Sequence, residues 1–135
     1  MLNDKPINPR HVWTWQDKAG VNQSHTPRIP PAFVADLCKD LLDEERRELD
    51  DAIAAQDLLE IADALGDMIY ILIGTAYKYG IPIGAVFEEI CRSNDSKFGP
   101  NGDEVLRRAD GKILKHPTWS PPDIHSILYP RTEPE

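Results

Sequence analysis

Three acidic side chains interrupt a long and otherwise mostly apolar segment that the residue periodicity predicts to be a helix. In the stretch from Asp57 to Gly80, these are Glu60, Asp63 and Asp67, spaced i, i+3 and i+7. This spacing places them on one stripe of a helix. Carboxylates are seldom buried without a partner, and a divalent cation is a common partner for several of them. The pattern therefore predicts a metal site on this stripe.

A second pair of acids lies just upstream, in a segment with the same helical periodicity. Apolar residues spaced three or four apart run from 34 to 52, and Glu45 and Glu48 fall on the same stripe. We expect two antiparallel helices to turn the two groups of acids toward one another. Mg²⁺ prefers such oxygen ligands and usually keeps water and substrate phosphates in its shell. A carboxylate not fully committed to the metal could act as general base.

Simpler explanations of the same acids remain open. Glu60 lies three residues after Asp57, which is the spacing of a capping box at a helix N-terminus. The acids of the first helix could be solvated, or paired with Arg46 and Arg47. Glu44 is ambiguous, because it lies one turn before an acid of the stripe.

The composition is that of a single globular domain. The chain has 135 residues, of which 41% are hydrophobic and 28% are charged. A net charge of −8 argues against nucleic acid as a partner but is compatible with a metal–nucleotide complex. We expect no signal peptide and no membrane span, because the required apolar segments are missing. Cys38 and Cys91 are predicted to be reduced core thiols, which fits a cytoplasmic protein.

The pattern predicts an all-α fold, with an antiparallel helix bundle and a loop-rich C-terminal segment. Expected helices cover residues 31–55, 57–80, 82–93 and 123–128, and a short strand at 112–115 could pair with 105–108. The central helix has more apolar surface than one neighbour can cover, so we expect a homodimer or a dimer of dimers. The predicted boundaries are an irregular N-terminal arm over 1–30, a helical catalytic domain over 31–128 and a frayed tail over 129–135.

The acid pattern resembles the signature of the all-α nucleoside triphosphate pyrophosphohydrolases. That superfamily includes the MazG proteins, the dimeric dUTPases and phosphoribosyl-ATP pyrophosphohydrolase. The chain is most similar to the small phage and bacterial MazG-like group, in DALGDMIYILIGTAYKYGIPI, SNDSK and GKILK…PPDI, within residues 33–128. The signature itself is Glu44-Glu45-x-x-Glu48 followed by Glu60-x-x-Asp63.

The resemblance implies a catalytic site that binds Mg²⁺ or Mn²⁺. Its ligands would be Glu45, Glu48, Glu60 and Asp63. A metal-activated water would attack a nucleoside triphosphate and release a nucleoside monophosphate and diphosphate. Asp67 would be a further or water-mediated ligand, or else a buried acid paired with a lysine.

The resemblance also suggests where the rest of the substrate binds. Asn94 and Lys97 fall where the family reaches toward phosphate or sugar, although they could be a turn residue and a solvated lysine. Lys112 and Lys115 could close over the phosphates. Trp15 could stack on the base, or it could pack the arm onto the body of the protein.

The base preference stays open, because the N-terminal arm departs from the wider superfamily. Some phage MazG-like enzymes that this chain resembles act on dGTP or GTP and feed dGMP to a pathway making 2-aminoadenine nucleotides. If phage-encoded, the protein would work in the host cytoplasm. The alternatives to an enzyme are a nucleotide-binding regulatory module with little turnover and a purely structural helical oligomer. No zinc motif or glycine-rich phosphate loop occurs.

Overall fold

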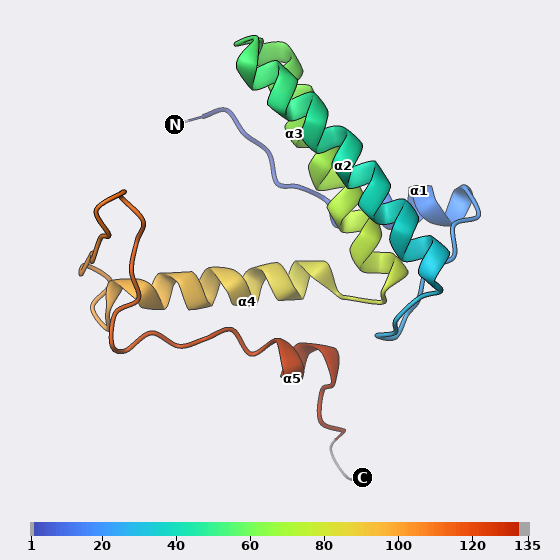
Figure 1. The fold of residues 1–135 in the computed structure, drawn as a ribbon. Coiled ribbons are helices and arrows are strands. Elements are labelled where there is room, and N and C mark those ends of the chain that lie inside the picture. The colour runs from blue at the N-terminus through green and yellow to red at the C-terminus, as the bar shows by residue number, and fades with distance from the viewer. Residues whose placement is uncertain (1, 133–135) are drawn as a thin grey trace. The chain divides into compact units, whose positions relative to one another are not determined.

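The computed structural model describes residues 2–132, and this part of the chain is helical with no named strand (Figure 1). This confirms the predicted all-α class. The last three residues of the predicted tail lie outside the described residues. Contacts divide the chain into two units, one up to Ile83 and one from Gly84 onward. The elements are α1 (Pro9–Lys18), α2 (Ala32–Ala54), α3 (Leu58–Lys78), α4 (Ile83–Asp95), the 3-10 turn η1 (Ser96–Phe98) and α5 (Ile124–Leu128).

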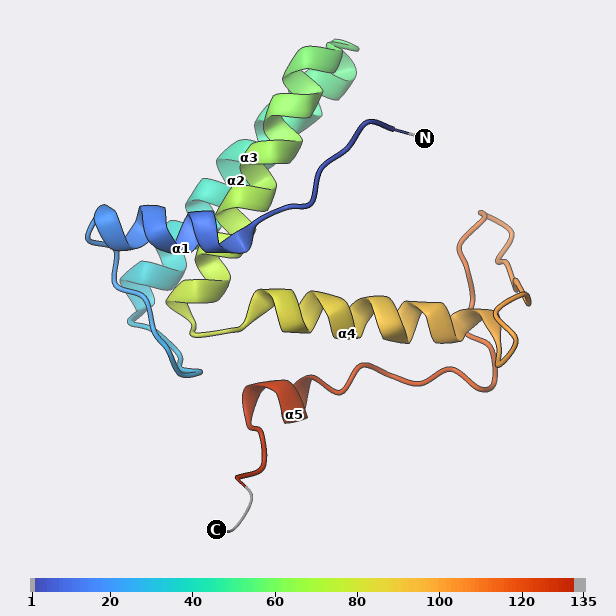
Figure 2. The same ribbon diagram turned by 180° about the vertical axis from the view of Figure 1, so that it is seen from behind.

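The body of the first unit is a hairpin of α2 and α3, which lie side by side in both views (Figures 1 and 2). The helices meet at a tight turn in which Gln56 has φ +52°. Asp57 then caps α3 by accepting the Glu60 N–H at 3.2 Å. Ala52 and Ala64 are 5% and 2% exposed, so small side chains allow the helices to approach closely near this turn.

The N-terminal arm is not wholly irregular, because it contains the helix α1. Pro9 sits at its start, and the Asn8 side chain caps it. The Gln16 side chain is 6% exposed and donates to the Gly74 carbonyl of α3 at 3.2 Å. A Cβ at Gly74 would collide with the Gln16 side chain, so the glycine allows α1 to pack closely against α3 at this point. Gln23 completes the contact by accepting from Gln16 at 2.8 Å.

The chain after α1 covers the C-terminal end of α3. The last carbonyls of a helix have no partner within the helix. Here the Tyr77 carbonyl accepts from the Ser24 N–H at 3.1 Å, and the Tyr79 carbonyl accepts from the Arg28 N–H at 2.9 Å. The Arg28 side chain donates to the Lys78 carbonyl at 3.3 Å. The arm therefore stabilises α3 at the end where the hairpin is open.

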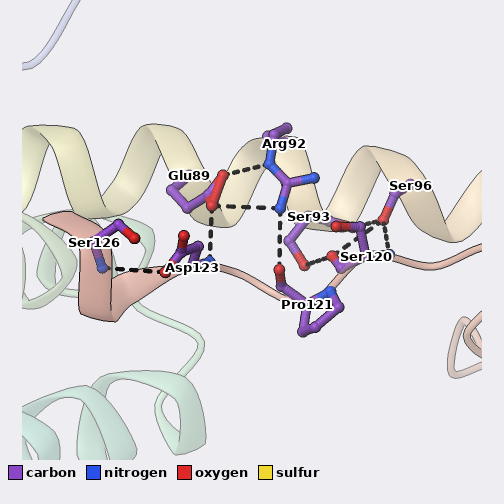
Figure 3. A network of polar contacts seen from close by, with 8 residues as sticks. All are labelled: Glu89, Arg92, Ser93, Ser96, Ser120, Pro121, Asp123 and Ser126. Carbon is purple, nitrogen blue, oxygen red and sulfur yellow. Dashed lines mark hydrogen bonds and ion pairs between the residues drawn. The ribbon is translucent and has the colours of Figure 1, made fainter.

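The second unit consists of α4 and a C-terminal segment tied along it (Figure 3). Glu89 pairs with Arg92 and accepts the Asp123 N–H at 2.8 Å. These two donors, the Arg92 side chain first, hold the pKa of Glu89 below its usual value. Further along α4, the buried Ser93 hydroxyl donates to the Ser120 carbonyl at 2.8 Å. Hydrogen bonds between α4 side chains and the backbone of the C-terminal segment thus hold this segment along α4.

Two expectations for the second unit are wrong. Residues 112–115 form no strand, because pairing is limited to one antiparallel bridge between Arg107 and Ile113 around a turn at Gly111. The bridge nevertheless joins the two segments that were expected to pair, 105–108 and 112–115. Cys91 is exposed rather than a core thiol, since the buried stripe of α4 runs through Val86 and Ser93.

The first unit leaves many apolar side chains exposed in the single chain. None of the large side chains in residues 2–132 is fully buried. On α3 alone, five aliphatic residues are 40% to 83% exposed: Leu58, Leu59, Leu65, Ile69 and Leu72. Among the described residues, there is no helix with the length and apolarity needed to cross a membrane.

We predict that Gly80→Ala destabilises the protein by roughly 2–4 kcal/mol. Gly80 has φ +68°, and a Cβ there would overlap the Thr26 carbonyl of the capping segment. Urea unfolding followed by circular dichroism measures the change. The control is Gly66→Ala within α3, where a Cβ meets nothing within 4 Å. That variant should be neutral or more stable, and equal stability of the two variants would contradict the proposed close approach.

Candidate functional site

The acids of both predicted stripes lie on the α2–α3 hairpin, which also positions them. Cys38 of α2 contacts Lys78 of α3, and the helices run antiparallel from that contact. Glu48 lies ten residues after Cys38 on α2. Ten residues before Lys78 on α3 is Met68, so Glu48 lies level with the residues around Asp67. The hairpin register therefore explains why acids ten or more residues apart in sequence come together.

Glu45 is the one acid of the set that is substantially buried. Its side chain is half-buried, and its Oε2 atom lies out of contact with solvent without a hydrogen-bond partner. Burial raises the pKa of Glu45, and the negative charges of Glu48, Asp67 and Asp63 raise it further. We call Glu45, Glu48, Asp63 and Asp67 the acid cluster. Glu48, Asp63 and Asp67 are themselves exposed, and their charges act on the one carboxyl that is partly buried.

Glu60 stands apart from the acid cluster. It is exposed in the first turn of α3, and its charge is not among those that raise the pKa of Glu45. The capping alternative holds only in part. The Asp57 side chain accepts the Glu60 N–H, but the Asp57 N–H donates to the Ala52 carbonyl. The Glu60 carboxylate is therefore not needed for the reciprocal bond of a capping box.

The alternative that arginines neutralise these acids fits poorly with the contacts. Arg46 pairs with Asp50 at 3.6 Å, one turn away on the exposed side of α2. Such an exposed pair contributes a few tenths of a kcal/mol. Within residues 2–132, no ion pair involves a member of the acid cluster. The cluster's negative charge is left uncompensated by the described part of the chain.

The acid cluster has the donor chemistry of a divalent cation site but not a closed ligand set. Among the described residues, no three acidic, histidine or cysteine side chains converge closely enough to hold one ion. The buried, unpartnered Oε2 of Glu45 is the observation that fits a cation, because a hard cation would satisfy that oxygen and relieve the repulsion.

An aromatic pair continues the acid cluster along α3. Tyr70 lies three residues after Asp67, hence on the same stripe, and the Trp15 ring meets it edge-on with centroids 6.1 Å apart. His11 contacts Tyr70 at the same centroid distance. Trp15 is 54% exposed and so leaves much of its ring available. Sequence reasoning missed Tyr70 and His11, although the spacing from Asp67 to Tyr70 could have indicated the tyrosine.

The two tryptophans of α1 point to different neighbours, as a helix requires. Trp13 packs against Tyr77, at a centroid distance of 5.2 Å, and against His25 at 4.8 Å. It therefore fixes the arm to the body. Trp15 is the tryptophan that keeps an accessible face.

The remaining predicted substrate residues belong to the second unit. Asn94 is exposed near the end of α4, and Lys97 lies in the 3-10 turn that follows. Lys112 is exposed beside the turn at Gly111. The Lys115 ammonium lies 4.0 Å from the centroid of the Trp119 ring, a cation–π contact.

Comparison with known families gives one match. The sequence model of a family described as Phosphoribosyl-ATP pyrophosphohydrolase matches residues 16–94, which is more than half of the chain and includes the acids of both helices. Curated proteins gave no match.

We predict that Glu45→Gln raises the thermal unfolding midpoint by about 2–4 °C in the absence of divalent cations at neutral pH. The pKa of Glu45 in the folded protein lies above its usual value of 4.5. The folded state is therefore destabilised by the ionisation of Glu45 as the pH rises from 4.5 through the raised pKa. The glutamine side chain does not ionise, so the variant keeps the stability that Glu45 loses at neutral pH. Calorimetry from pH 4 to 8 measures the effect. Glu44→Gln, at an exposed neighbouring position, should show no such gain, and an unchanged midpoint for Glu45→Gln would contradict electrostatic strain.

Proposed function

The chain belongs to the phosphoribosyl-ATP pyrophosphohydrolase family, and we propose that it hydrolyses a nucleoside triphosphate to a nucleoside monophosphate and diphosphate. The family lies within the MazG-like all-α pyrophosphohydrolase superfamily, so nucleotide pyrophosphohydrolase activity is the general expectation. The observation that carries the proposal is the partly buried Glu45 carboxyl among like charges, with its Oε2 atom lacking a hydrogen-bond partner. A site so arranged is stabilised by the cation that accompanies a triphosphate.

We propose Mg²⁺, or Mn²⁺, as the cofactor. Glu45, Glu48 and Asp63 would hold it, with Asp67 as a further or water-mediated ligand and Glu60 contributing from the first turn of α3. When bound, such an ion neutralises phosphate charge and lowers the pKa of an attacking water. The carboxylates themselves position the ion and the water. One that is not fully engaged accepts the proton released by that water.

The aromatic pair supports a place for the base. Asp67 and Tyr70 lie on one stripe of α3, separated by about 4.5 Å of helix rise. A nucleotide with its phosphates at the acid cluster could therefore direct its base toward Trp15 and Tyr70. Exposed indole rings stack well on bases. The proposed substrate is a (d)NTP, with dGTP or GTP as the first candidates and control of a nucleotide pool as the role.

The lysines of the second unit are proposed phosphate ligands. Lys97 and Lys112 carry mobile positive charges that suit phosphate oxygens. Asn94 would hydrogen-bond to phosphate or sugar. Lys115 is the least favoured phosphate ligand among these four residues, because its ammonium already contacts the Trp119 ring.

We propose that a second copy of the chain covers the exposed apolar residues of α3. Leu65, Ile69 and Leu72 lie on one side of this helix and are 47%, 40% and 49% exposed. Monomeric proteins rarely leave so continuous an apolar face in water. Sedimentation equilibrium at micromolar concentration tests the homodimer or dimer of dimers, and a purely monomeric protein would contradict it.

The proposed function predicts that purified protein with Mg²⁺ converts at least one (d)NTP to monophosphate and diphosphate. The screen covers common and deaminated nucleotides, with phosphoribosyl-ATP included because the matching family is named for it. Ion-exchange chromatography resolves the products. Glu48→Gln should lower kcat about 100-fold or more, since it removes a charge from the acid cluster. Glu44→Gln is the matched control and should retain activity.

Other results of the same screen separate the alternatives. Nucleotide binding without products would favour a regulatory module. The absence of both binding and a Mg²⁺-dependent rise in Tm would favour a structural oligomer. Full activity of Glu48→Gln would remove this residue from the site.

A second prediction concerns Trp15. Trp15→Ala should raise KM for the preferred nucleotide about tenfold, because loss of one base–aromatic contact costs roughly 1–3 kcal/mol. The value of kcat should change little, since the acid cluster is untouched. Trp15→Phe keeps an aromatic face and should restore most of the affinity. Steady-state kinetics on all three proteins provide the measurement, and an unchanged KM for Trp15→Ala would place the base elsewhere.

A further inference from the structure

Lys78 and Cys38 form a buried pair that the proposed reaction does not use. Lys78 lies in the last turn of α3 and is 8% exposed, while Cys38 near the start of α2 is 5% exposed. The Lys78 Nζ atom lies 3.5 Å from the Cys38 Sγ atom. A buried amine and a buried thiol thus face each other across the open end of the helix hairpin.

The pairing is unusual because a buried lysine normally has an anionic partner. Within residues 2–132, none of the ion pairs includes Lys78. The Arg28 side chain approaches only the Lys78 backbone carbonyl, at 3.3 Å. The hydrogen-bond partner of Nζ is the thiol itself. Packing alone would be served by an apolar residue at position 78, so the lysine calls for another explanation.

We propose that this pair is an oxidative modification site, at which peroxide joins Cys38 covalently to Lys78. A sulfenic acid formed on a cysteine can condense with a nearby nitrogen. Here the nearby nitrogen is Nζ, already in contact with Sγ. The exposed Cys91 of α4 has no such neighbour among the described residues and would oxidise without forming this bridge.

The chemistry balances with one equivalent of hydrogen peroxide. Peroxide first oxidises the Cys38 thiol by two electrons to the sulfenic acid, and one water leaves. Nζ, after losing a proton to solvent, attacks Sγ. The S–N bond forms as the S–O bond breaks, and the hydroxyl takes a second proton from the nitrogen and leaves as a second water. The product is a neutral sulfenamide, and the net step releases one proton to solvent. A dithiol reverses the step by reducing sulfur to the thiol and freeing the amine.

The position of the pair defines what the bridge would do. Cys38 precedes Glu45 by two helical turns, about 10 Å along α2. The connecting turn already holds the other end of the hairpin. A bridge at the open end would fix α2 and α3 at both ends and so hold the acid cluster in one register.

The test treats the Cys91→Ser protein with hydrogen peroxide, then measures intact mass and maps peptides. The expected product loses about 2 Da and yields one linked peptide containing Cys38 and Lys78. Its Tm should rise by roughly 5–15 °C, since the bridge closes a long loop. Dithiothreitol should restore the original mass and Tm. A bridge that keeps the sulfenic oxygen, heavier by about 14 Da and using a second peroxide, would equally support the pairing.

Matched variants separate the bridge from simple thiol oxidation. Lys78→Met and Cys38→Ser, each in the Cys91→Ser background, should form no linked peptide and show no rise in Tm. Peptide mapping of the Cys91→Ser protein decides the question even if a variant fails to fold. Recovery of Cys38 only as sulfinic or sulfonic acid, with Lys78 free, would overturn the proposal. Nucleotide hydrolysis by the reduced protein is a separate measurement, so the two proposals can fail independently.

Discussion

The partly buried carboxyl of Glu45 is the constraint on which the functional interpretation depends. Its Oε2 atom has lost water without gaining a hydrogen bond, and three other carboxylates oppose its ionisation. Uncompensated burial of charge is costly, and such an arrangement persists only where the surrounding structure enforces it. The α2–α3 hairpin enforces it here. A divalent cation would turn the same repulsion into a set of ligands, and the proposed metal site depends on this.

A single helix connects this cluster to the rest of the first unit. Asp67, Tyr70, Gly74 and Lys78 follow one another at three- or four-residue intervals along α3. They therefore share a stripe, and Tyr70, Gly74 and Lys78 contact Trp15, Gln16 and Cys38 respectively. The acids lie at the start of this stripe, and Tyr70 follows with its contact to Trp15. Helix α1 packs on the stripe at Gly74, and Lys78 is its last residue. The phosphate end and the base end of the proposed nucleotide site are thus held at a fixed spacing by one rigid element.

The open end of the hairpin depends on polar contacts more than on a large core. Residues of the arm satisfy the last carbonyls of α3, and the buried Lys78–Cys38 pair lies beside them. This explains how two long helices with few buried large side chains keep one register. The second unit also relies on polar contacts, because Glu89 and Ser93 of α4 hydrogen-bond to the C-terminal segment. In both units, specific hydrogen bonds fix segments that apolar burial alone would leave loose.

Helical periodicity was enough to predict the all-α class and the course of α2 and α3, and the acid spacing placed the acids on one stripe of each helix. These are local properties, set by positions three and four apart on a helix. The same spacing identified Glu60, which the structure places in the exposed first turn of α3. Partners distant in sequence were also beyond local reasoning: Trp15 with Tyr70, and Cys38 with Lys78. Their contacts follow from how the arm and the two helices pack, and packing is decided by the whole chain rather than by any one segment of it.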